Sequence, residues 1–209
     1  MTVVSGDAVV VEGDGLVLRE WRDDDVDAMV KIFDNDDVAR FTPLPVPFGA
    51  AQAEAHLATA REKRAAGTRL RFAVTTDGGL PLGEVMVNLE DGTLGYAIGP
   101  EHRGRGLAVR ATRLLTSYAH EELGLRELRL QIDEDNLASR AVATATGYRM
   151  VEDEAEWIES DGRRVLLTSW LHEDTADRPH GHAADRPHDH TVDRPHAAIA
   201  DRSSHEDTA

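Results

Sequence analysis

One junction in the chain limits strongly what it can fold into. Residues 102–108 read His-Arg-Gly-Arg-Gly-Leu-Ala, between a short apolar strand pattern over residues 94–98 and a long helical pattern over residues 107–123. A strand that enters a glycine-rich turn and then a helix brings several backbone N–H groups to the positive end of the helix dipole. The sequence therefore predicts a site for a phosphate or pyrophosphate in a fold that contains both strands and helices.

Two common nucleotide motifs do not fit this turn. The P-loop pattern, Gly-x-x-x-x-Gly-Lys-Ser/Thr, is absent. The dinucleotide pattern, Gly-x-Gly-x-x-Gly, fails because Val109 stands where its third glycine belongs. On the turn alone, an ordinary connector between a strand and a helix stays equally open.

Size and charge limit the class of protein. The chain has 209 residues, no cysteine and a formal net charge of −16. We expect a cytoplasmic, soluble protein without disulfides, since no apolar run approaches the roughly 20 residues that span a bilayer. The negative charge disfavours nucleic acid as a partner and is compatible with an amine-bearing one. It also fits a purely solubilising surface.

The C-terminal segment differs from the rest of the chain. Asp-Arg-Pro-His occurs at residues 177–180, 185–188 and 193–196, and six of the ten histidines lie between His180 and His205. Such a segment buries too little apolar surface to offset its ordering entropy. We expect residues 173–209 to be a disordered appendage, with weak metal binding as the alternative, and residues 1–14 to be flexible.

The domain between them, residues 15–172, alternates strand and helix patterns, which predicts an α/β fold with a mixed sheet and helices on its faces. The predicted strands are residues 16–19, 70–75, 82–89, 93–98, 128–132 and a hairpin of 148–157 with 164–171. The predicted helices are 26–33, 50–66, 107–123 and 137–146, and residues 41–48, with three prolines, form an extended loop.

The domain resembles the GCN5-related N-acetyltransferase (GNAT) family over residues 16–171. Residues 103–108 match the family motif Arg/Gln-x-x-Gly-x-Gly/Ala, and residues 136–139 with Gly147-Tyr148 match its Asn-x-x-Ser helix and Gly-Phe/Tyr ending. Residues 16–25, Phe41-Thr42-Pro43, Gly95-Tyr96 and Ser139 are similar to the RimJ/RimL-type branch. The resemblance implies a central mixed sheet with two splayed parallel strands, which we assign to residues 82–89 and 94–98.

The resemblance also implies acetyl-CoA as the co-substrate. Its pyrophosphate would bind the backbone N–H groups of residues 103–108, and residues 85–87 and 98–100 would contact the pantetheine and the thioester carbonyl. The predicted cofactor residues are Ile98, Gly99, Pro100, Arg103, Gly104, Arg105, Gly106, Leu107, Ala108, Asn136, Ser139 and Arg140.

The catalytic groups are less determined. Many family members have a tyrosine as the acid where this chain has Ala143. Ser139 then becomes the candidate acid, although a helix-side hydroxyl bonded to its own backbone is the alternative. Glu156, by resemblance to RimL-type enzymes, and Glu84 are candidate bases, unless ordered water carries the proton or these acids are surface groups. We predict no metal, and His102 more as a cofactor contact than as a catalyst.

These observations predict an N-acetyltransferase that moves acetyl from acetyl-CoA to a primary amine. The leading acceptor is a protein N-terminal amine, as the RimJ/RimL resemblance implies. A small-molecule amine such as an aminoglycoside or polyamine is the alternative, as is a catalytically weak CoA-binding regulatory module. A monomer and a homodimer both stay open.

Overall fold

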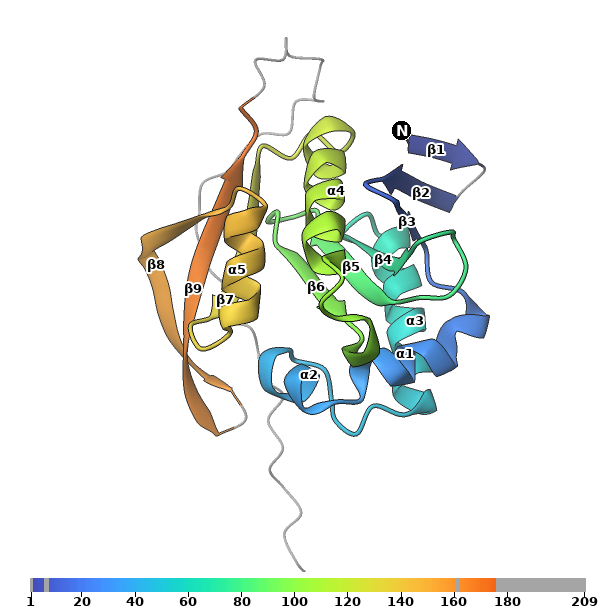
Figure 1. Ribbon diagram of the computed structural model, residues 1–209, viewed down its shortest axis with the longest axis horizontal. Coiled ribbons are helices and arrows are strands. Elements are labelled where there is room, and N and C mark those ends of the chain that lie inside the picture. The colour runs from blue at the N-terminus through green and yellow to red at the C-terminus, as the bar shows by residue number, and fades with distance from the viewer. Residues whose placement is uncertain (1, 6–7, 161, 176–209) are drawn as a thin grey trace, which may run out of the picture. The chain divides into compact units, whose positions relative to one another are not determined.

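The computed structural model describes residues 2–5, 8–160 and 162–175, which form two antiparallel sheets and five α-helices (Figure 1). The compact unit ends at Thr175, so the expectations for the repeat tail lie outside the described residues. The first sheet has the order β1 (Thr2–Ser5), β2 (Ala8–Gly13), β3 (Leu16–Arg19), β4 (Arg69–Thr75), β5 (Gly83–Asn88) and β6 (Leu94–Ile98). The second has the order β7 (Glu127–Asp133), β9 (Arg163–Glu173) and β8 (Arg149–Ser160). The helices are α1 (Val26–Phe33), α2 (Asp36–Phe41), α3 (Ala50–Ala65), α4 (Leu107–Glu121) and α5 (Leu137–Ala145), with short 3₁₀ turns η1 (Asp23–Asp25) and η2 (Pro100–His102).

The N-terminal segment was expected to be flexible, and the structure instead contains two strands there. β2 pairs with β3 through a two-residue turn at Asp14-Gly15, where φ is 52° and 67°. Positive φ at both positions matches the twist of a tight hairpin. Val11 lies opposite Leu18 and is 3% exposed in the core. The hairpin forms because this apolar residue gains a buried position that the local sequence alone does not reveal.

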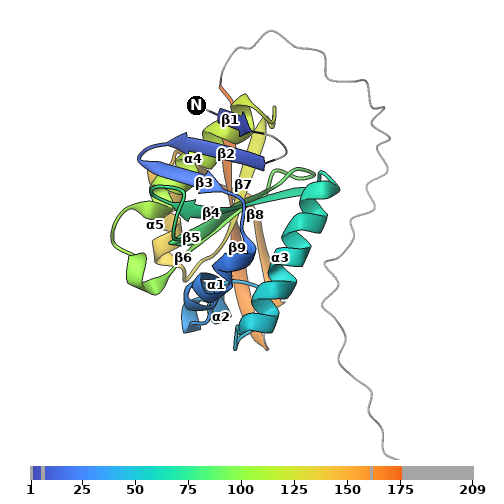
Figure 2. The ribbon, with the colours of Figure 1, turned by 90° about the vertical axis from the view of Figure 1, so that its right-hand side faces the viewer.

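Side chains of the first sheet alternate between two helical layers. Phe72 and Val85 point to one core, shared with α4. Ala73 belongs to the other core, shared with α1 and α3. Figures 1 and 2 show α4 and α3 on opposite sides of the strands. No helix in the described part of the chain is long and apolar enough to cross a membrane.

The splayed strands are not the pair that we predicted. β5 is antiparallel to β6 and hydrogen-bonded to β4 on its other side, so its backbone groups are already used within the sheet. The parallel neighbours are β6 and β7. They touch at one bridge, Thr93 to Arg129, with Arg129 N donating to Gly92 O at 3.0 Å. No ladder continues between residues 94–98 and 130–133, so the two sheets separate there.

Candidate active site

A cavity of about 390 Å³ lies beside the end of β6, at the strand edge that faces the gap between the sheets. Its walls are the end of β6, the glycine turn with the start of α4, the first turns of α5, and α2. The lining residues are Asp37, Val38, Phe41, Thr42, Tyr96, Ala97, Ile98, His102, Arg103, Gly104, Gly106, Leu107, Ala108, Val109, Asn136, Ala138, Ser139 and Val142.

The glycine turn has the conformation that the motif requires. Gly104 has φ 74°, and Gly106, the N-cap of α4, has φ 69°. A Cβ at either position would meet no atom within 4 Å. The protein's own packing therefore does not demand glycine at these two positions. The left-handed backbone demands it, and the open space beside the helix N-terminus is where an anion can approach the N–H groups.

Arg103 of this turn is held by α2. Its Nη1 donates to the carboxylate of Asp37, and its Nε donates to Ile98 O at 3.2 Å. At the other end of α2, Arg40 pairs with Asp135 at 3.1 Å, in the loop before α5. α2 is thus tied to both flanks of the cavity. The carboxylate on Arg103 stands where a bound phosphate would compete for the guanidinium.

Sequence reasoning missed α2, which forms one wall of the cavity. The helix has only six residues, below the length at which hydrophobic periodicity is readable. A capping signal was present, because Asn35 accepts a hydrogen bond from Val38 N at 3.2 Å and two aspartates follow in the first turn.

Asn136 and Ser139 lie together at the start of α5. Asn136 caps α5, and its side-chain oxygen accepts from Ser139 N at 3.0 Å. Both residues line the cavity, with Ser139 half-buried. Arg140 does not line it; its Nη1 donates to Glu134 O at 3.3 Å.

The structure brings most of the predicted cofactor residues to the cavity. Gly99 and Pro100 line a different hollow, of about 430 Å³, and Arg105 is exposed and lines neither. The predicted residues that line the cavity are Ile98, Arg103, Gly104, Gly106, Leu107, Ala108, Asn136 and Ser139.

Glu84 lies away from the cavity in a buried cluster. Its carboxylate accepts from Trp21 Nε1 at 2.8 Å, contacts His56 Nε2 at 2.8 Å, and pairs with Arg71 at 2.5 Å. Burial alone would raise the pKa of Glu84, but Arg71, followed by His56 and Trp21, lowers it below the ordinary glutamate value. A carboxylate with every oxygen engaged and a lowered pKa is a weak base.

Glu156 lies on β8, where the strand resumes its pairing after an irregularity between Val151 and Glu156. Its side chain is exposed and does not line the cavity. The structure therefore does not bring Glu156 to Ser139, and the prediction that it acts as the base stays a prediction.

A tyrosine that our sequence reading noted only as part of a motif enters the site. Tyr96, on β6, lines the cavity together with Ser139. Burial raises the pKa of Tyr96 to about 12, against which the neighbouring Ser139 hydroxyl acts in the opposite direction. The signal in the sequence was an aromatic residue with a polar tip in the middle of the strand that leads to the glycine turn.

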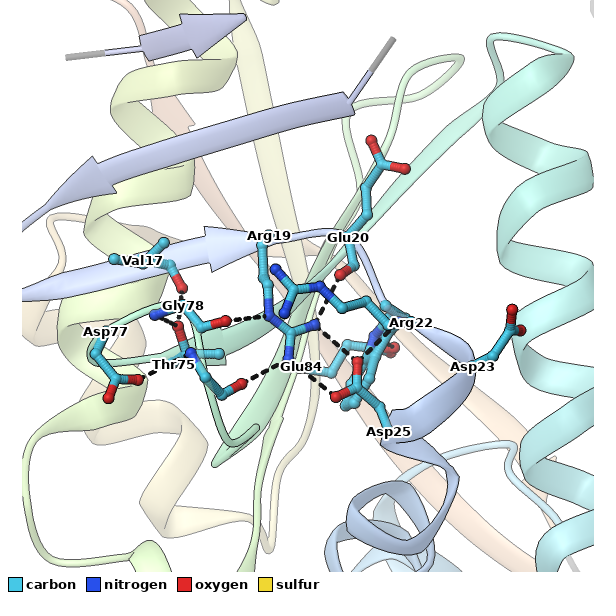
Figure 3. Close-up of polar contacts among 12 residues, drawn as sticks. Val17, Arg19, Glu20, Arg22, Asp23, Asp25, Thr75, Asp77, Gly78 and Glu84 are labelled. Atoms are coloured by element: carbon cyan, nitrogen blue, oxygen red, sulfur yellow. Dashed lines mark hydrogen bonds and ion pairs between the residues drawn. The ribbon is translucent and has the colours of Figure 1, made fainter. Parts of the chain in front are cut away.

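A buried arginine anchors the segment that leads into α1 (Figure 3). Arg19 forms a bidentate pair with Asp25, at 2.7 and 2.9 Å. It also donates to the carbonyl oxygens of Gly78, Gly79 and Glu20, at 2.8, 2.6 and 2.9 Å. Because the guanidinium satisfies the carboxylate and three carbonyls at once, the strand, the β4–β5 turn and the start of α1 are fixed to one another.

Comparisons with known proteins agree with this geometry. Residues 15–149 match the family model described as an acetyltransferase (GNAT) domain. The chain is 28% identical over 146 residues to the uncharacterized N-acetyltransferase YoaA of Bacillus subtilis, which covers 67% of this chain and 82% of that protein. Two solved structures share the fold. RimJ of Mycobacterium smegmatis, in complex with a CoA disulfide, has TM-score 0.67 and 18% identity, over 80% of this chain and 87% of that one. Spermidine N-acetyltransferase of Vibrio cholerae, in complex with CoA and spermine, has TM-score 0.64 and 17% identity, over 77% and 96%.

The fold and the family match thus define an acetyltransferase. The chain belongs to the GNAT acetyltransferase family.

Proposed function

We propose that this GNAT protein acetylates a primary amine with acetyl-CoA, and that the acceptor is the N-terminal amine of a protein. The observation that carries the cofactor part is the cavity where β6 and β7 part. The glycine turn, Asn136 and Ser139 line this cavity together. When bound, acetyl-CoA supplies an activated acetyl thioester.

The residues present fit this co-substrate. Gly104 and Gly106 leave open space beside the N-terminus of α4, where backbone N–H groups bind the pyrophosphate. Arg103 exchanges the carboxylate of Asp37 for a phosphate oxygen. Ile98 at the end of β6 offers a strand edge that no ladder occupies, and this edge binds the pantetheine amides.

The acceptor side of the proposal has separate support. RimJ of Mycobacterium smegmatis shares the fold. The RimJ/RimL-type branch is also the one that Gly95-Tyr96 and Ser139 of this chain resemble. The net charge of −16 favours a cationic acceptor. A polyamine is the second candidate, because the spermidine N-acetyltransferase of Vibrio cholerae shares the fold to a similar degree.

For the chemistry, we propose that Ser139 directs its hydroxyl to the thioester sulfur. The amine loses its proton through ordered water, since neither Glu84 nor Glu156 lines the cavity. Glu156 stays the residue to test as a base, because the resemblance to RimL-type enzymes predicts that role for it.

An acceptor screen tests the function. The full chain is incubated with acetyl-CoA and a panel of free-N-terminal peptides, polyamines and aminoglycosides, and acetylated products are identified by mass spectrometry. We expect turnover on peptides with a free α-amine and none on the same peptides with a blocked N-terminus. Turnover on polyamines alone would favour the second candidate. Saturable CoA binding without any product would instead support a regulatory module, and absence of CoA binding would overturn the proposal.

A further inference from the structure

One buried hydroxyl in the cavity lacks a partner in strict hydrogen-bond geometry. The Tyr96 hydroxyl is shielded from solvent, and within the described part of the chain no polar atom meets it at full hydrogen-bond distance and angle. A buried polar group left unpaired costs about 1–3 kcal/mol, so such a group calls for an explanation. Tyr148, another buried tyrosine, shows the ordinary solution, because its hydroxyl lies 2.8 Å from Thr116 Oγ1.

The position of Tyr96 suggests what satisfies it. The Ser139 hydroxyl lowers the pKa of Tyr96 as a hydrogen-bonding neighbour, although the two hydroxyls do not meet in strict hydrogen-bond geometry. Tyr96 comes from the middle of β6 and Ser139 from the first turn of α5, so two different elements bring these side chains to the cavity.

Helix α5 carries no tyrosine whose hydroxyl could take this place. Ala143, where related enzymes place a tyrosine, is fully buried in the core and carries no polar group. Thr144 is exposed and its hydroxyl donates to Arg140 O at 3.0 Å. Tyr96 is thus the aromatic hydroxyl that shares the cavity with Ser139.

We propose that Tyr96 is a positioning residue, whose hydroxyl donates to Ser139 Oγ and thereby directs the Ser139 proton toward the sulfur of the bound thioester. This inference rests on the proposed function. In the reaction the amine nitrogen bonds to the acetyl carbon and gives up one proton, the carbon–sulfur bond breaks, and the sulfur keeps the electron pair and takes one proton. The hydrogen bond from Ser139 stabilises the negative charge that develops on the sulfur during this step.

Tyr96 acts as a donor and not as the proton source. Burial raises its pKa to about 12, whereas a thiol has an ordinary pKa of about 8.5. Transfer of the tyrosine proton to the thiolate is therefore uphill. A hydroxyl that stays protonated at every working pH is instead a permanent hydrogen-bond donor.

The first test compares two tyrosine variants for stability. Tyr96→Phe removes an unpaired hydroxyl, so we expect a melting temperature equal to or above that of the unaltered protein. Tyr148→Phe, the matched control, removes a hydroxyl that is already bonded to Thr116, so it should lower the melting temperature and leave turnover unchanged. A clear loss of stability in Tyr96→Phe would show a structural role and overturn the inference.

The second test needs no acceptor. Thiolate absorbance in the ultraviolet gives the pKa of the thiol of bound CoA. A donor pointed at the sulfur favours the charged thiolate, so this pKa should lie about one pH unit below that of free CoA in the unaltered protein. It should return toward the free value in both Tyr96→Phe and Ser139→Ala. If bound CoA titrates like free CoA in the unaltered protein, the inference fails.

The third test uses whichever acceptor the screen identifies. Tyr96→Phe should lower kcat about tenfold or more and change the KM for acetyl-CoA less than about twofold. The double variant Tyr96→Phe/Ser139→Ala should be no slower than Ser139→Ala alone, because Tyr96 acts through Ser139. Additive losses would mean that Tyr96 acts by another route. A shifted thiol pKa without turnover on any acceptor would leave the Tyr96 inference standing and would refute the proposed function instead.

Discussion

At the scale of single residues, Glu84 and Glu156 were both candidate bases in the sequence, but their surroundings in the structure differ. Glu84 is 5% exposed and engaged by Trp21, His56 and Arg71. Glu156 is exposed on β8. Both were predicted as candidate bases from sequence position. Burial and the geometry of the partners cannot be read from the sequence. They assign Glu84 a role in stability and leave the role of Glu156 open.

Replacing Glu84 with glutamine should lower the free energy of unfolding at pH 7 by about 2–4 kcal/mol, because Arg71 loses its buried counter-ion. The folded-state pKa of Glu84 is lowered, so its stabilisation is present above the unfolded value of about 4.3 and is lost as the pH falls through the folded one. The difference between the variant and the unaltered protein should therefore shrink below about pH 4. Urea unfolding at a series of pH values measures it.

The matched control is Glu156→Gln, which should change the free energy of unfolding by less than about 0.5 kcal/mol. If Glu156 is the base, this variant loses turnover without losing stability. A Glu84→Gln protein as stable as the original would contradict the structural role assigned to the buried cluster.

At the scale of elements, two glycines in the same backbone conformation flank α4, one at each end, and their surroundings differ. Gly106, at its N-terminus, has φ 69°, and Gly124, beyond its C-terminus, has φ 70°. A Cβ at either position would meet nothing within 4 Å. The backbone strain of a substitution is thus similar at the two ends, and only one end faces the cavity.

Gly106→Ala and Gly124→Ala should each lose about 1 kcal/mol of stability, from the left-handed backbone. Only Gly106→Ala should raise the dissociation constant of acetyl-CoA, at least about tenfold, because the added methyl group blocks approach to the N–H groups. Calorimetric titration of both variants decides it. Equal affinities for the two proteins would show that the pyrophosphate binds elsewhere.

The contact between α4 and β9 predicts a pH dependence. His172 Nδ1 lies 2.9 Å from Nε2 of His120, and burial, followed by His120, lowers the pKa of His172 although Asp174 opposes this. Because the folded-state pKa is below the unfolded value of about 6.5, this contribution to stability is full above that value and is lost as the pH falls below it. His172→Asn should therefore reduce the drop in melting temperature between pH 8 and pH 5.5, by about 2–4 °C.

His102→Asn, at the end of η2 and far from this contact, is the control and should keep the original pH dependence. A His172→Asn protein whose melting temperature falls with acid as steeply as before would place the pH sensitivity in other groups.

At the scale of the whole molecule, the described domain accounts for its own stability. Within the part of the chain that the structure describes, the residues of the two cores lie between Val9 and Trp170, and the compact unit ends at Thr175. A chain cut after Thr175 should keep its melting temperature within about 1 °C and its acetyl-CoA affinity unchanged, because the sequence of the repeats has few large apolar side chains to bury. Differential scanning calorimetry and titration measure both. A loss of either would assign the repeats a role in folding or in binding.

Local signals predicted much of this molecule. The glycine turn and the apolar periodicities indicated a mixed α/β fold, because each depends on neighbours only a few positions away in the chain. Prediction failed where pairing is non-local. The splayed strands proved to be β6 and β7, since which strands lie side by side depends on contacts between distant segments.

The sequence by itself determined that a glycine turn leads into a helix in a GNAT-like domain, because backbone conformation at glycines and caps is set locally. Only the tertiary structure decided which polar groups are buried and what they meet. Glu84 contacts Trp21, His56 and Arg71, Arg103 contacts a carboxylate on α2, and the Tyr96 hydroxyl has no partner in strict hydrogen-bond geometry within the described part of the chain. The free energy of a charge or hydroxyl depends on solvent exposure and on partners from other elements, and these exist only once the sheets and helices are packed.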